Sequence, residues 1–517
     1  MARIGIDVGG TNTDAVVLSG KAVVASTKVV TTSDITTGIL DALAKVLSTP
    51  GVNPSDVDGV MIGTTHFINA VVQRRDLSRC AAVRIGLPAS DSLPPFVDWP
   101  KDLAQLVNGG VYMLEGGLDY DGRPIMPLDE AGLEAVAKEI AASDITTVAI
   151  SAIFSPLDPK DELRTAEILR SAAPHLHITP SYTLGRIGLL ERENAAILNA
   201  ALIDLAQHTI SGFEQALSSS GIGAPLFITQ NDGTVMPASY AKAHPILSFA
   251  SGATNSMRGA AALSGLESGM VVDVGGTTTD IGALRHRFPR EANAAVKVGG
   301  VRTLFRMPDL LSIGLGGGSH VVQNQEDVEE VSVGPLSVGY RLTSEALIFG
   351  GERLTTSDIA VADGILKLGD ATAVQALDPN LIAAAKEEIK RLLSDAIDSM
   401  KSEAGEVPLL AVGGGAFLVP EDLQGVAEVI RVSHGDVANA VGAAIAQISG
   451  ETDQVFQGMG REAAIAEAQR IAIERATAAG ASPDSIEVVE VEDTPLSYLP
   501  GDARRVRVRV VGNLAKL

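Results

Sequence analysis

The sequence contains a single cysteine, Cys80, which excludes an internal disulfide and a cysteine-rich metal cluster. Aromatic residues are also scarce, at 3 % of 517 residues, although hydrophobic residues make up 46 %. The core must therefore be built mainly from alanine, valine, isoleucine and leucine, while 53 glycines provide sharp turns and close backbone contacts. This composition favours an α/β enzyme over an all-β module.

Positive charge is scarce too, because the formal net charge is −23 and no run of lysine or arginine is interleaved with aromatic residues. Nucleic acid and anionic membranes are therefore not expected as partners. No uninterrupted apolar stretch is long enough to span a bilayer, and the first strand-like run starts at Arg3, which leaves no room for a signal peptide. We expect a cytoplasmic protein in a reducing environment.

Two common nucleotide-binding motifs are missing. The sequence has no Gly-x-x-x-x-Gly-Lys-Ser/Thr loop, and the run Gly314–Ser319 lacks the third spaced glycine of a dinucleotide-binding fingerprint. With one cysteine, a zinc-bearing sugar kinase is excluded, and an iron–sulfur activator of radical dehydratases would need cysteines shared between subunits. His175 and His177 lack nearby carboxylates at a spacing that predicts a metal site.

What the sequence does contain is one glycine-rich loop twice. The segment Asp7–Asp14 reads Asp-Val-Gly-Gly-Thr-Asn-Thr-Asp and recurs as Asp273–Asp280, where only Thr278 differs, standing in place of Asn12. Each copy lies between two short apolar runs that favour β-strands. The pattern predicts the turn of a β-hairpin in each half of a duplicated protein.

Such a turn can hold phosphate without a lysine, because glycines let backbone N–H groups face outward and threonine hydroxyls add donors. The predicted phosphate-binding residues are Gly9, Gly10, Thr11, Asn12, Thr13, Gly275, Gly276, Thr277, Thr278 and Thr279. Asp7 and Asp273 end the strands before the loops and are predicted to hold Mg²⁺ through its waters. With Thr11 and Thr277, these aspartates are the predicted catalytic residues of an ATP site.

A third glycine-rich turn, formed by Gly413, Gly414 and Gly415, follows the apolar run Leu409–Val412. Because this turn lies downstream of the second loop, we predict that it lets the adenosine of ATP lie against the backbone. An ordinary strand-to-helix turn is the alternative.

These elements predict two α/β lobes, at residues 1–188 and 189–450, with ATP between them, followed by an α+β subdomain at 451–517. Residues 86–127, rich in glycine, proline and aspartate, are predicted to form an irregular insertion. The helical stretch Leu189–Ala216 is the predicted crossing between the lobes, and Val437–Ile448 is predicted to be a helix of small residues that packs tightly on a neighbour.

Further motifs are spread over nearly the whole chain, and they include Gly63-Thr64-Thr65, Met307–Gly314, Val333-Gly334-Pro335 and Pro495–Gly501. Together with the two loops, these motifs resemble those of the hydantoinase/oxoprolinase family, which includes ATP-dependent hydantoinase, 5-oxoprolinase, lactamase and acetone carboxylase subunits. The resemblance implies an actin-like, sugar-kinase-like and Hsp70-like ATPase fold. It also implies that ATP activates the oxygen of an amide, imide or ketone, with a second hydrolase-like subunit or a homo-oligomer as partner.

The chain departs from the family pattern at two places. His66-Phe67-Ile68 stands where many relatives read Val-Ala-Thr, and Ser251-Gly252-Ala253-Thr254-Asn255-Ser256 stands where they read Ser-Gly-Pro-Ala-Gly-Gly. Substrate choice is expected to depend on His66–Ile68 and Ala253–Ser256. The residues predicted to contact substrate are Thr64, Thr65, His66, Asn69, Gly316, Gly317 and Ser319. For His66 and Asn69, packing at the surface or in the core is the alternative. Arg186 and Arg192 are further candidates, and a solvated face or a salt bridge between the lobes is their alternative.

The leading functional hypothesis is an ATP-dependent hydrolase component that acts on a cyclic amide or imide, such as a hydantoin, an oxoproline or a lactam. A nucleotide-gated binding or chaperone-like ATPase remains open, because actin-like lobes serve that role too. A small-molecule kinase is the third hypothesis. Stimulation of ATP turnover by a cyclic amide would separate the first hypothesis from the second.

Overall fold

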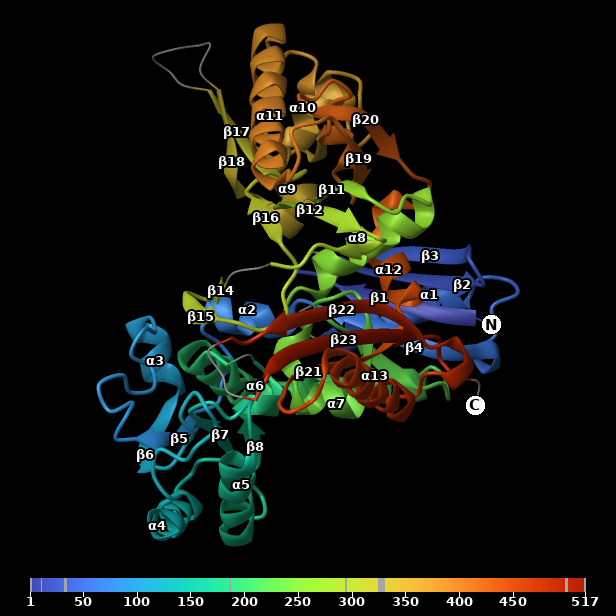
Figure 1. The fold of residues 1–517 in the computed structure, drawn as a ribbon. Helices are drawn as coiled ribbons and strands as arrows, with labels where there is room; N and C mark the ends of the chain where they lie inside the picture. Colours follow the sequence, from blue (N-terminus) through green and yellow to red (C-terminus); the bar gives the residue numbers. More distant parts are fainter. Residues whose placement is uncertain are drawn as a thin grey trace.

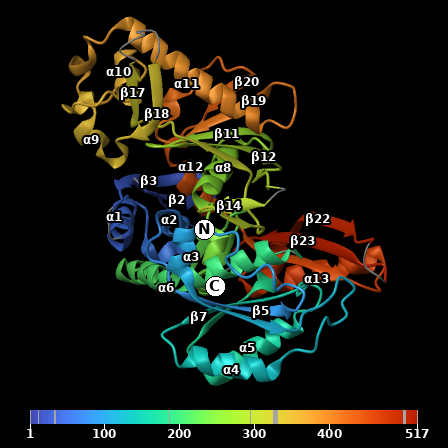
Figure 2. The same cartoon turned by 90° about the vertical axis from the view of Figure 1, so that its left-hand side faces the viewer.

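The computed structural model describes residues 2–10, 12–31, 35–185, 187–292, 295–323, 331–497 and 501–515. Three parts are visible in Figure 1: a central body, a second lobe above it and a smaller four-stranded domain below it. The same three parts are separate in the perpendicular view of Figure 2. Among the described residues, no helix is both long and apolar enough to cross a lipid bilayer.

The central body is built on a nine-stranded sheet. Its strands are, in spatial order, β22 (Glu487–Pro495), β23 (Arg504–Gly512), β21 (Ile448–Phe456), β10 (Val235–Pro237), β9 (Leu226–Thr229), β4 (Val57–Thr64), β1 (Ala2–Val8), β2 (Asn12–Ser19) and β3 (Ala22–Val30). The helices of this body are α1 (Ile35–Leu47), α2 (His66–Gln73), α6 (Leu189–Ser219), α7 (Ala238–Ala243) and α13 (Arg461–Ala478). Aliphatic side chains of β1, β4, α1 and α6 form its main core.

The second lobe is built on a six-stranded sheet. Five strands follow the order β13 (Phe288–Pro289), β12 (Thr279–Arg285), β11 (Gly269–Val274), β19 (Val407–Val412) and β20 (Val426–Arg431), and β16 (Leu310–Ile313) also pairs with β12. The lobe also contains β17 (Ser319–Gln323), β18 (Val331–Ser337), α9 (Leu342–Glu345), α10 (Thr356–Ala362) and α11 (Pro379–Met400). The apolar face of α11 packs on this sheet and forms a second core with it.

The four-stranded domain has the strand order β6 (Asn108–Glu115), β5 (Cys80–Leu87), β7 (Thr147–Ala152) and β8 (His177–Pro180), and all of its pairs are parallel. Three further helices lie in this region, namely α3 (Lys101–Val107), α4 (Glu130–Ala141) and α5 (Lys160–Ala172). Residues 86–127 are therefore not an irregular insertion throughout, because α3 and β6 lie within them. The run Asn108–Glu115 pairs with β5, and this long-range contact is not visible in a turn-rich composition.

The sheet pairings run across the predicted domain boundaries. Strands β9 and β10 follow the boundary at 188/189, yet β9 pairs with β4 in the central body. Strand β21 follows α12 (Ala438–Ile445) after two residues and pairs with β10, so the α+β tail extends the central sheet. The prediction that Leu189–Ala216 crosses between the lobes is wrong, because α6 is buried in the core of the central body.

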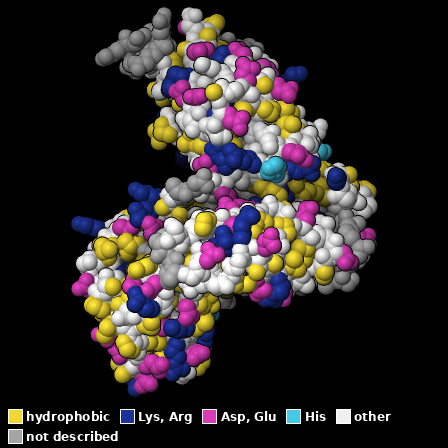
Figure 3. Space-filling view, viewed as in Figure 1, with side chains coloured by type: hydrophobic (Ala, Val, Ile, Leu, Met, Phe, Trp, Pro, Cys, Tyr) yellow, Lys and Arg dark blue, Asp and Glu magenta, His cyan; other side chains and the backbone are white. Residues whose placement is uncertain are grey.

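The crossing is made instead by α8 (Ser251–Ser264) and α12, which lie between the second lobe and the central body in Figure 1. The two helices touch through glycines: a Cβ at Gly259 would lie 1.8 Å from the Ala438 carbonyl oxygen, and a Cβ at Gly442 would lie 1.8 Å from the Asn255 carbonyl oxygen. The predicted tight packing of the small-residue helix is therefore confirmed, although the helix ends at Ile445. Figure 3 shows a hollow in the surface between the second lobe and the body.

A second connection between the two parts is an arm that leaves β12 and returns at β16. We call residues 286–292 and 295–309 the arm; it carries the hairpin of β14 (Val296–Val298) and β15 (Val301–Thr303). Val298 and Val301 are buried in the core of the central body, and Arg74 at the end of α2 donates to the Gly299 carbonyl oxygen across 2.9 Å. The arm therefore fixes part of the second lobe's chain onto the central body.

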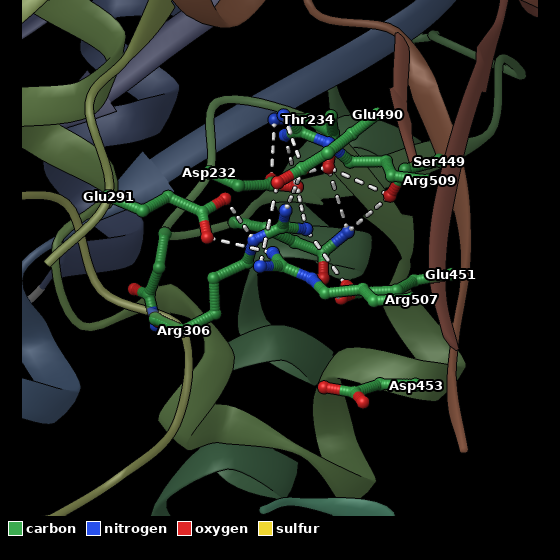
Figure 4. A network of polar contacts seen from close by, with 12 residues as sticks. Asp232, Thr234, Glu291, Arg306, Ser449, Glu451, Asp453, Glu490, Arg507 and Arg509 are labelled. Carbon is green, nitrogen blue, oxygen red and sulfur yellow. Dashed lines mark hydrogen bonds and ion pairs between the residues drawn. The ribbon is translucent and has the colours of Figure 1, made fainter. Parts of the chain in front are cut away.

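A network of buried charges anchors the arm to the tail strands (Figure 4). Arg306 lies 3.1 Å from Asp232, 2.8 Å from Glu451 and 3.0 Å from Glu490, and it also pairs with Glu291. Its side chain is 13 % exposed. Two arginines of β23 join the same carboxylates, with Arg507 on Glu291 and Glu451 and Arg509 on Asp232 and Glu490.

Candidate functional site

The two repeated segments fold into two equivalent hairpin turns. In the first, Asp7 pairs with Asp14 and the Gly9 N–H donates to the Asn12 carbonyl oxygen across 3.0 Å. In the second, Asp273 pairs with Asp280 and the corresponding bond from Gly275 to Thr278 measures 2.9 Å. The predicted hairpin turns are confirmed, and the sequence repeat is also a repeat of hydrogen-bond geometry.

Room for a ligand exists at the tips of the glycine-rich turns. A Cβ at Gly10 or at Gly414 would meet no atom within 4 Å. Gly10 and Thr278 are exposed, whereas Gly276 and Thr277 are half-buried. Thr11, which was predicted to bind phosphate and to take part in catalysis, lies outside the described residues, as does Arg186.

Two of the predicted phosphate ligands are corrected by the structure. Thr13 and Thr279 are fully buried, and their hydroxyl groups are used inside the protein, on Thr31 at 3.2 Å and on the Leu315 carbonyl oxygen at 2.6 Å. Cross-strand partners share a face of a hairpin, and these threonines pair with Val8 and Val274 on the buried face. They stabilise the turns and do not face the open side.

The aspartates Asp7 and Asp14 share the other face of the first hairpin, where Asn439 of α12 contacts both. Its Nδ2 lies 3.0 Å from Asp7 and 2.9 Å from Asp14. Asn255 of α8 donates to the second Asp7 oxygen across 3.3 Å, and Lys28 pairs with Asp14 at 2.6 Å. The strand end predicted to hold Mg²⁺ is therefore oriented by two neutral amides.

Burial shapes the acidity of both loop aspartates. It raises the pKa of Asp7 to about 6, and the nearby Asp14 carboxylate adds to this rise. Burial likewise raises the pKa of Asp273 to about 6; Asp280 and Asp7 contribute in the same direction, while a hydrogen bond from Ser256 opposes them. A cation placed near these carboxylates would favour their charged forms and relieve this penalty.

The turn Gly413–Gly415, which is predicted to receive adenosine, is in direct contact with the second loop. Gly413 has φ +88°, and a Cβ there would lie 2.3 Å from Asp273 Oδ1 and 2.4 Å from the Val274 carbonyl oxygen. The Gly415 N–H donates to the same Val274 oxygen across 2.8 Å. The structure thus brings the predicted adenosine-binding glycines beside the second phosphate loop, and a short 3₁₀ turn, Ala416–Leu418, follows them.

The glycine-rich run Gly314–Ser319 supports the second loop. The Gly317 N–H donates to the Gly275 carbonyl oxygen across 3.0 Å, and a Cβ at Gly316 would lie 2.6 Å from the Thr277 nitrogen. Ser319 is fully buried and accepts from the Gly316 N–H at 2.8 Å. Gly316, Gly317 and Ser319 were predicted to face substrate, but the structure gives them a packing role. The backbones of the two glycines pack against the second loop, and the Ser319 hydroxyl binds the backbone of the same run.

The other predicted substrate residues lie beside Asp7. Thr64 ends β4, is buried and exchanges hydrogen bonds with Ser251 at 3.2 and 3.1 Å. Thr65 contacts the first turn of α8, where a Cβ at Gly252 would lie 3.3 Å from its Cγ2 and 3.9 Å from both Asp7 carboxylate oxygens. Thr65 also accepts from Asn69 at 3.3 Å. The structure therefore brings Thr64, Thr65 and Asn69 next to the first loop.

His66 is half-buried at the start of α2, where burial lowers the pKa of its imidazole. Its ring centroid lies 6.2 Å from that of Phe67 in an edge-to-face contact. The other arginine candidate, Arg192, is fully buried in the central body and donates to Ser181 across 2.8 Å, which corrects its predicted substrate role. It stabilises the junction of α6 with the four-stranded domain.

These residues are compatible with a Mg²⁺ site. Within the described ranges, no three or more His, Cys, Asp and Glu side chains lie close enough together to bind a metal directly. Asp7 and Asp273 would hold the ion through its waters, as Mg²⁺ retains much of its hydration shell. The Oδ1 atom of Asn255 supports this fit, because it is a buried acceptor beside Asp7 without a partner among the described residues.

Sequence reasoning missed Asn255 and Asn439 as parts of this site. Asn255 carried a signal, since it replaces a glycine of the family pattern. Asn439 carried none, because its position depends on the crossing of α12 with α8. The roles of Asp14 and Asp280 could have been derived from the hairpin register, which places them opposite Asp7 and Asp273.

Comparisons with known proteins give matches over most of the chain. A model of the hydantoinase/oxoprolinase N-terminal region matches residues 3–173, and a hydantoinase/oxoprolinase model matches residues 192–373. The caprolactamase subunit alpha of Pseudomonas jessenii is 24 % identical over 401 residues, covering 71 % of this chain and 55 % of the relative. The acetophenone carboxylase gamma subunit of Aromatoleum aromaticum is 24 % identical over 399 residues, covering 70 % and 53 %.

The chain spans about half the length of these curated relatives. Among solved structures, the ATP-dependent caprolactamase from Pseudomonas jessenii superimposes with a TM-score of 0.77 at 19 % identity, covering 99 % of this chain and 88 % of that one. Nucleotide-free acetone carboxylase superimposes with a TM-score of 0.70 at 18 % identity, covering 100 % and 89 %. The predicted α/β fold with two lobes and duplicated loops is confirmed. Since the two family models together match more than half of the sequence, the chain belongs to the hydantoinase/oxoprolinase family.

Proposed function

We propose that the chain is the ATP-using component of a hydrolase that activates the carbonyl oxygen of a cyclic amide or imide. Hydantoins, oxoproline and lactams are the substrates of this class. The observation that carries the proposal is the pair of matched hairpin turns, in which Asp7 pairs with Asp14 and Asp273 pairs with Asp280. Two such turns can bind the triphosphate of ATP from both sides, and the Gly413 turn beside the second one would receive the adenosine.

The proposed chemistry has three steps. The carbonyl oxygen of the ring attacks the γ-phosphorus of ATP, the bond to the β,γ-bridging oxygen breaks, and ADP leaves. Water then adds to the ring carbon, and the ring C–N bond breaks as nitrogen takes up a proton, which leaves an acyl phosphate. A second water adds to the acyl carbon, and phosphate leaves with the former carbonyl oxygen. The protein's part is to position the reactants and to stabilise charge with backbone N–H groups of the turns. Mg²⁺, when bound, would neutralise phosphate charge.

The substrate end of this site is proposed to lie where Thr65, His66 and Asn69 begin α2. They are close to the first loop, because a Cβ placed at Gly252 of α8 would lie 3.3 Å from Thr65 Cγ2 and 3.9 Å from both Asp7 carboxylate oxygens. Caprolactamase, a relative named for a lactam, supports the cyclic amide class. Because the chain spans about half of such relatives, we propose that a second hydrolase-like subunit, or a second copy of this chain, completes the enzyme.

A second candidate is activation of a ketone for carboxylation, which the acetophenone and acetone carboxylase relatives support. In that reaction the phosphorylated oxygen would be that of an enol, and a carbon–carbon bond would form with bicarbonate-derived carbon dioxide. Ketone-stimulated ATP turnover that depends on bicarbonate would identify this reaction. Ring opening without bicarbonate would identify the first.

The test is to incubate the chain, with and without the product of the neighbouring gene, with Mg²⁺-ATP and a panel of hydantoins, lactams and oxoproline. A substrate labelled with ¹⁸O at the carbonyl should deliver the label to inorganic phosphate. Label retained in the ring-opened product would contradict the departure of phosphate with the former carbonyl oxygen. A stable phosphorylated small molecule would favour a kinase, and ATP-dependent protein binding without any stimulation by the panel would favour a chaperone-like ATPase.

A further inference from the structure

The carboxylate of Asp7 is held by one amide from each of the two crossing helices. Asn255 of α8 lies 3.3 Å from one carboxylate oxygen, and Asn439 of α12 lies 3.0 Å from the other. Both amides are neutral donors, so they fix the orientation of the carboxylate without cancelling its charge. Within the described residues no lysine or arginine forms an ion pair with Asp7, because Lys28 pairs with Asp14 instead.

The next residue of α8 lies near the other loop. Ser256 is buried and close enough to Asp273 to lower the pKa of that carboxyl, while the Asp7 charge raises it. Two consecutive residues of one helix therefore lie beside the aspartates of both turns. Because α8 is a continuous helix, the distance between these two residues is fixed by its backbone, and not by a flexible loop.

The position of Asn255 itself is tightly constrained. The residue is fully buried, and its Nδ2 also donates to Thr229 across 3.1 Å. A Cβ at Gly63 would lie 2.2 Å from this Nδ2, and a Cβ at Gly442 would lie 1.8 Å from the Asn255 carbonyl oxygen. Glycines on two separate elements thus leave space for this asparagine. Neither the side chain nor the backbone of Asn255 can move without disturbing its neighbours.

The remaining atom of the amide, Oδ1 of Asn255, is buried and has no hydrogen-bond partner within the described structure. Buried acceptors of this kind are normally satisfied by an ordered water. Beside the Asp7 carboxylate, which has no lysine or arginine ion pair among the described residues, a water bound to a hydrated divalent cation has the required donor. The orphan oxygen is therefore an observation, independent of the aspartates, that points to a bound ion.

We infer that Asn255, Ser256 and Asn439 are positioning residues, which set the spacing of Asp7 and Asp273 around a hydrated divalent cation and offer Asn255 Oδ1 to one of its waters. The inference rests on the proposed nucleotide site, and it adds residues of α8 and α12 that the repeated loops do not contain. It is independent of which ring or ketone the enzyme uses.

The test uses Mn²⁺ as the cation and ADP as the nucleotide, with the full chain. Free Mn²⁺ is followed by electron paramagnetic resonance in the presence of saturating ADP, and ADP binding without metal is followed by calorimetry. We expect Asn255→Ser and Asn439→Ser each to raise the Kd for Mn²⁺ at least tenfold. Metal-free ADP affinity should change less than threefold, because the backbone donors of the turns are intact.

The matched control is Asn199→Ser, which removes another buried amide that donates to Thr179 at 3.2 Å and to the Ala243 carbonyl oxygen at 2.8 Å. This variant should lower the Tm but keep the Kd for Mn²⁺. If Asn255→Ser does not fold, Asn439→Ser decides the question, since it acts on the other oxygen of the same carboxylate. Unchanged Mn²⁺ affinity in a folded variant would overturn the inference, whereas a wild-type chain that binds no ADP would overturn the nucleotide site itself.

Discussion

Asn439 donates a hydrogen bond to Asp7 across 3.0 Å, although 432 positions separate the two residues in the chain. The same amide lies 2.9 Å from Asp14, so a residue of the last crossing helix holds both acidic side chains of the first hairpin. The first loop is therefore completed only when α12 has packed against β1, where a Cβ at Gly5 would lie 2.0 Å from the Ala440 carbonyl oxygen.

Replacement of either loop aspartate should impair ATP turnover without unfolding the protein. Asp7→Asn and Asp273→Asn keep the shape of the side chain but remove the charge that would attract the hydrated cation, and we expect Mg²⁺-dependent turnover to fall by about tenfold or more. Steady-state phosphate release measures this. Asp398→Asn, at an exposed position of α11, is the control. Unchanged turnover in both loop variants would mean that the loops do not form the ATP site.

The same aspartates should make the metal-free protein less stable as pH rises. Folding raises the pKa of Asp273 from 3.8 to about 6, so the folded protein binds more protons than the unfolded chain between these values. Stability from this group therefore falls as pH rises through that window, and the cost is fully present above about pH 6.

In EDTA, Asp273→Asn should consequently raise the Tm at about pH 7.5 and give little gain near pH 4, where the wild-type carboxyl is already protonated. Differential scanning fluorimetry at both pH values measures the change. The exposed Asp398→Asn substitution serves again as the reference. An equal shift at both pH values would show that charge is not its cause.

A side chain at Gly413 should disturb the second loop. The position has φ +88°, and the added Cβ would lie 2.3 Å from Asp273 Oδ1. We expect Gly413→Ala to lower the free energy of unfolding by about 1–3 kcal/mol and to weaken ADP binding, since the carboxylate must move. Urea denaturation and calorimetry measure the two effects. Gly405→Ala, where a Cβ would meet nothing within 4 Å, should change neither.

The buried charge network should be sensitive to the loss of its central arginine. Arg306→Met removes the arginine shared by Asp232, Glu451 and Glu490, while Arg507 and Arg509 still contact these carboxylates. Because removing one member of a buried ion pair costs about 3–5 kcal/mol, we expect a loss toward the lower end of this range. Chemical denaturation of the two proteins measures this loss.

The matched substitution Arg391→Met removes pairs with Glu388 and Asp395 on α11, where the arginine side chain is 56 % exposed. Exposed pairs contribute about 0–1 kcal/mol, so this variant should remain close to wild type. A similar loss in both variants would show that burial does not distinguish the two arginines.

The sequence was most informative where local signals agreed with the tertiary structure. The repeated loops were found because the same residues occur twice, and helix α12 lies where a helix of small residues was predicted, at Ala438–Ile445 within the predicted range Val437–Ile448. The central sheet could not be divided correctly, because the pairing of β9 with β4 joins residues far apart in the sequence.

In the site, sequence reasoning identified the turns but assigned the wrong face to Thr13 and Thr279. Composition suggested hydroxyl donors, whereas the hairpin register places both side chains on the buried face with Val8 and Val274. Asn439 could not be found at all, since only the crossing of α8 and α12 through Gly259 and Gly442 brings it to Asp7.

The arm has a practical consequence for anyone who wishes to study the second lobe in isolation. A fragment cut at the two crossing helices would still carry Arg306 and Glu291, while Asp232, Glu451 and Glu490 stayed behind with the other piece. Val298 and Val301 would likewise lose the apolar surroundings that now bury them. Such a fragment would expose an apolar hairpin and leave Arg306 with Glu291 as the one carboxylate kept from this network. Aggregation is therefore the expected result, and the chain is better studied by point substitution than by truncation.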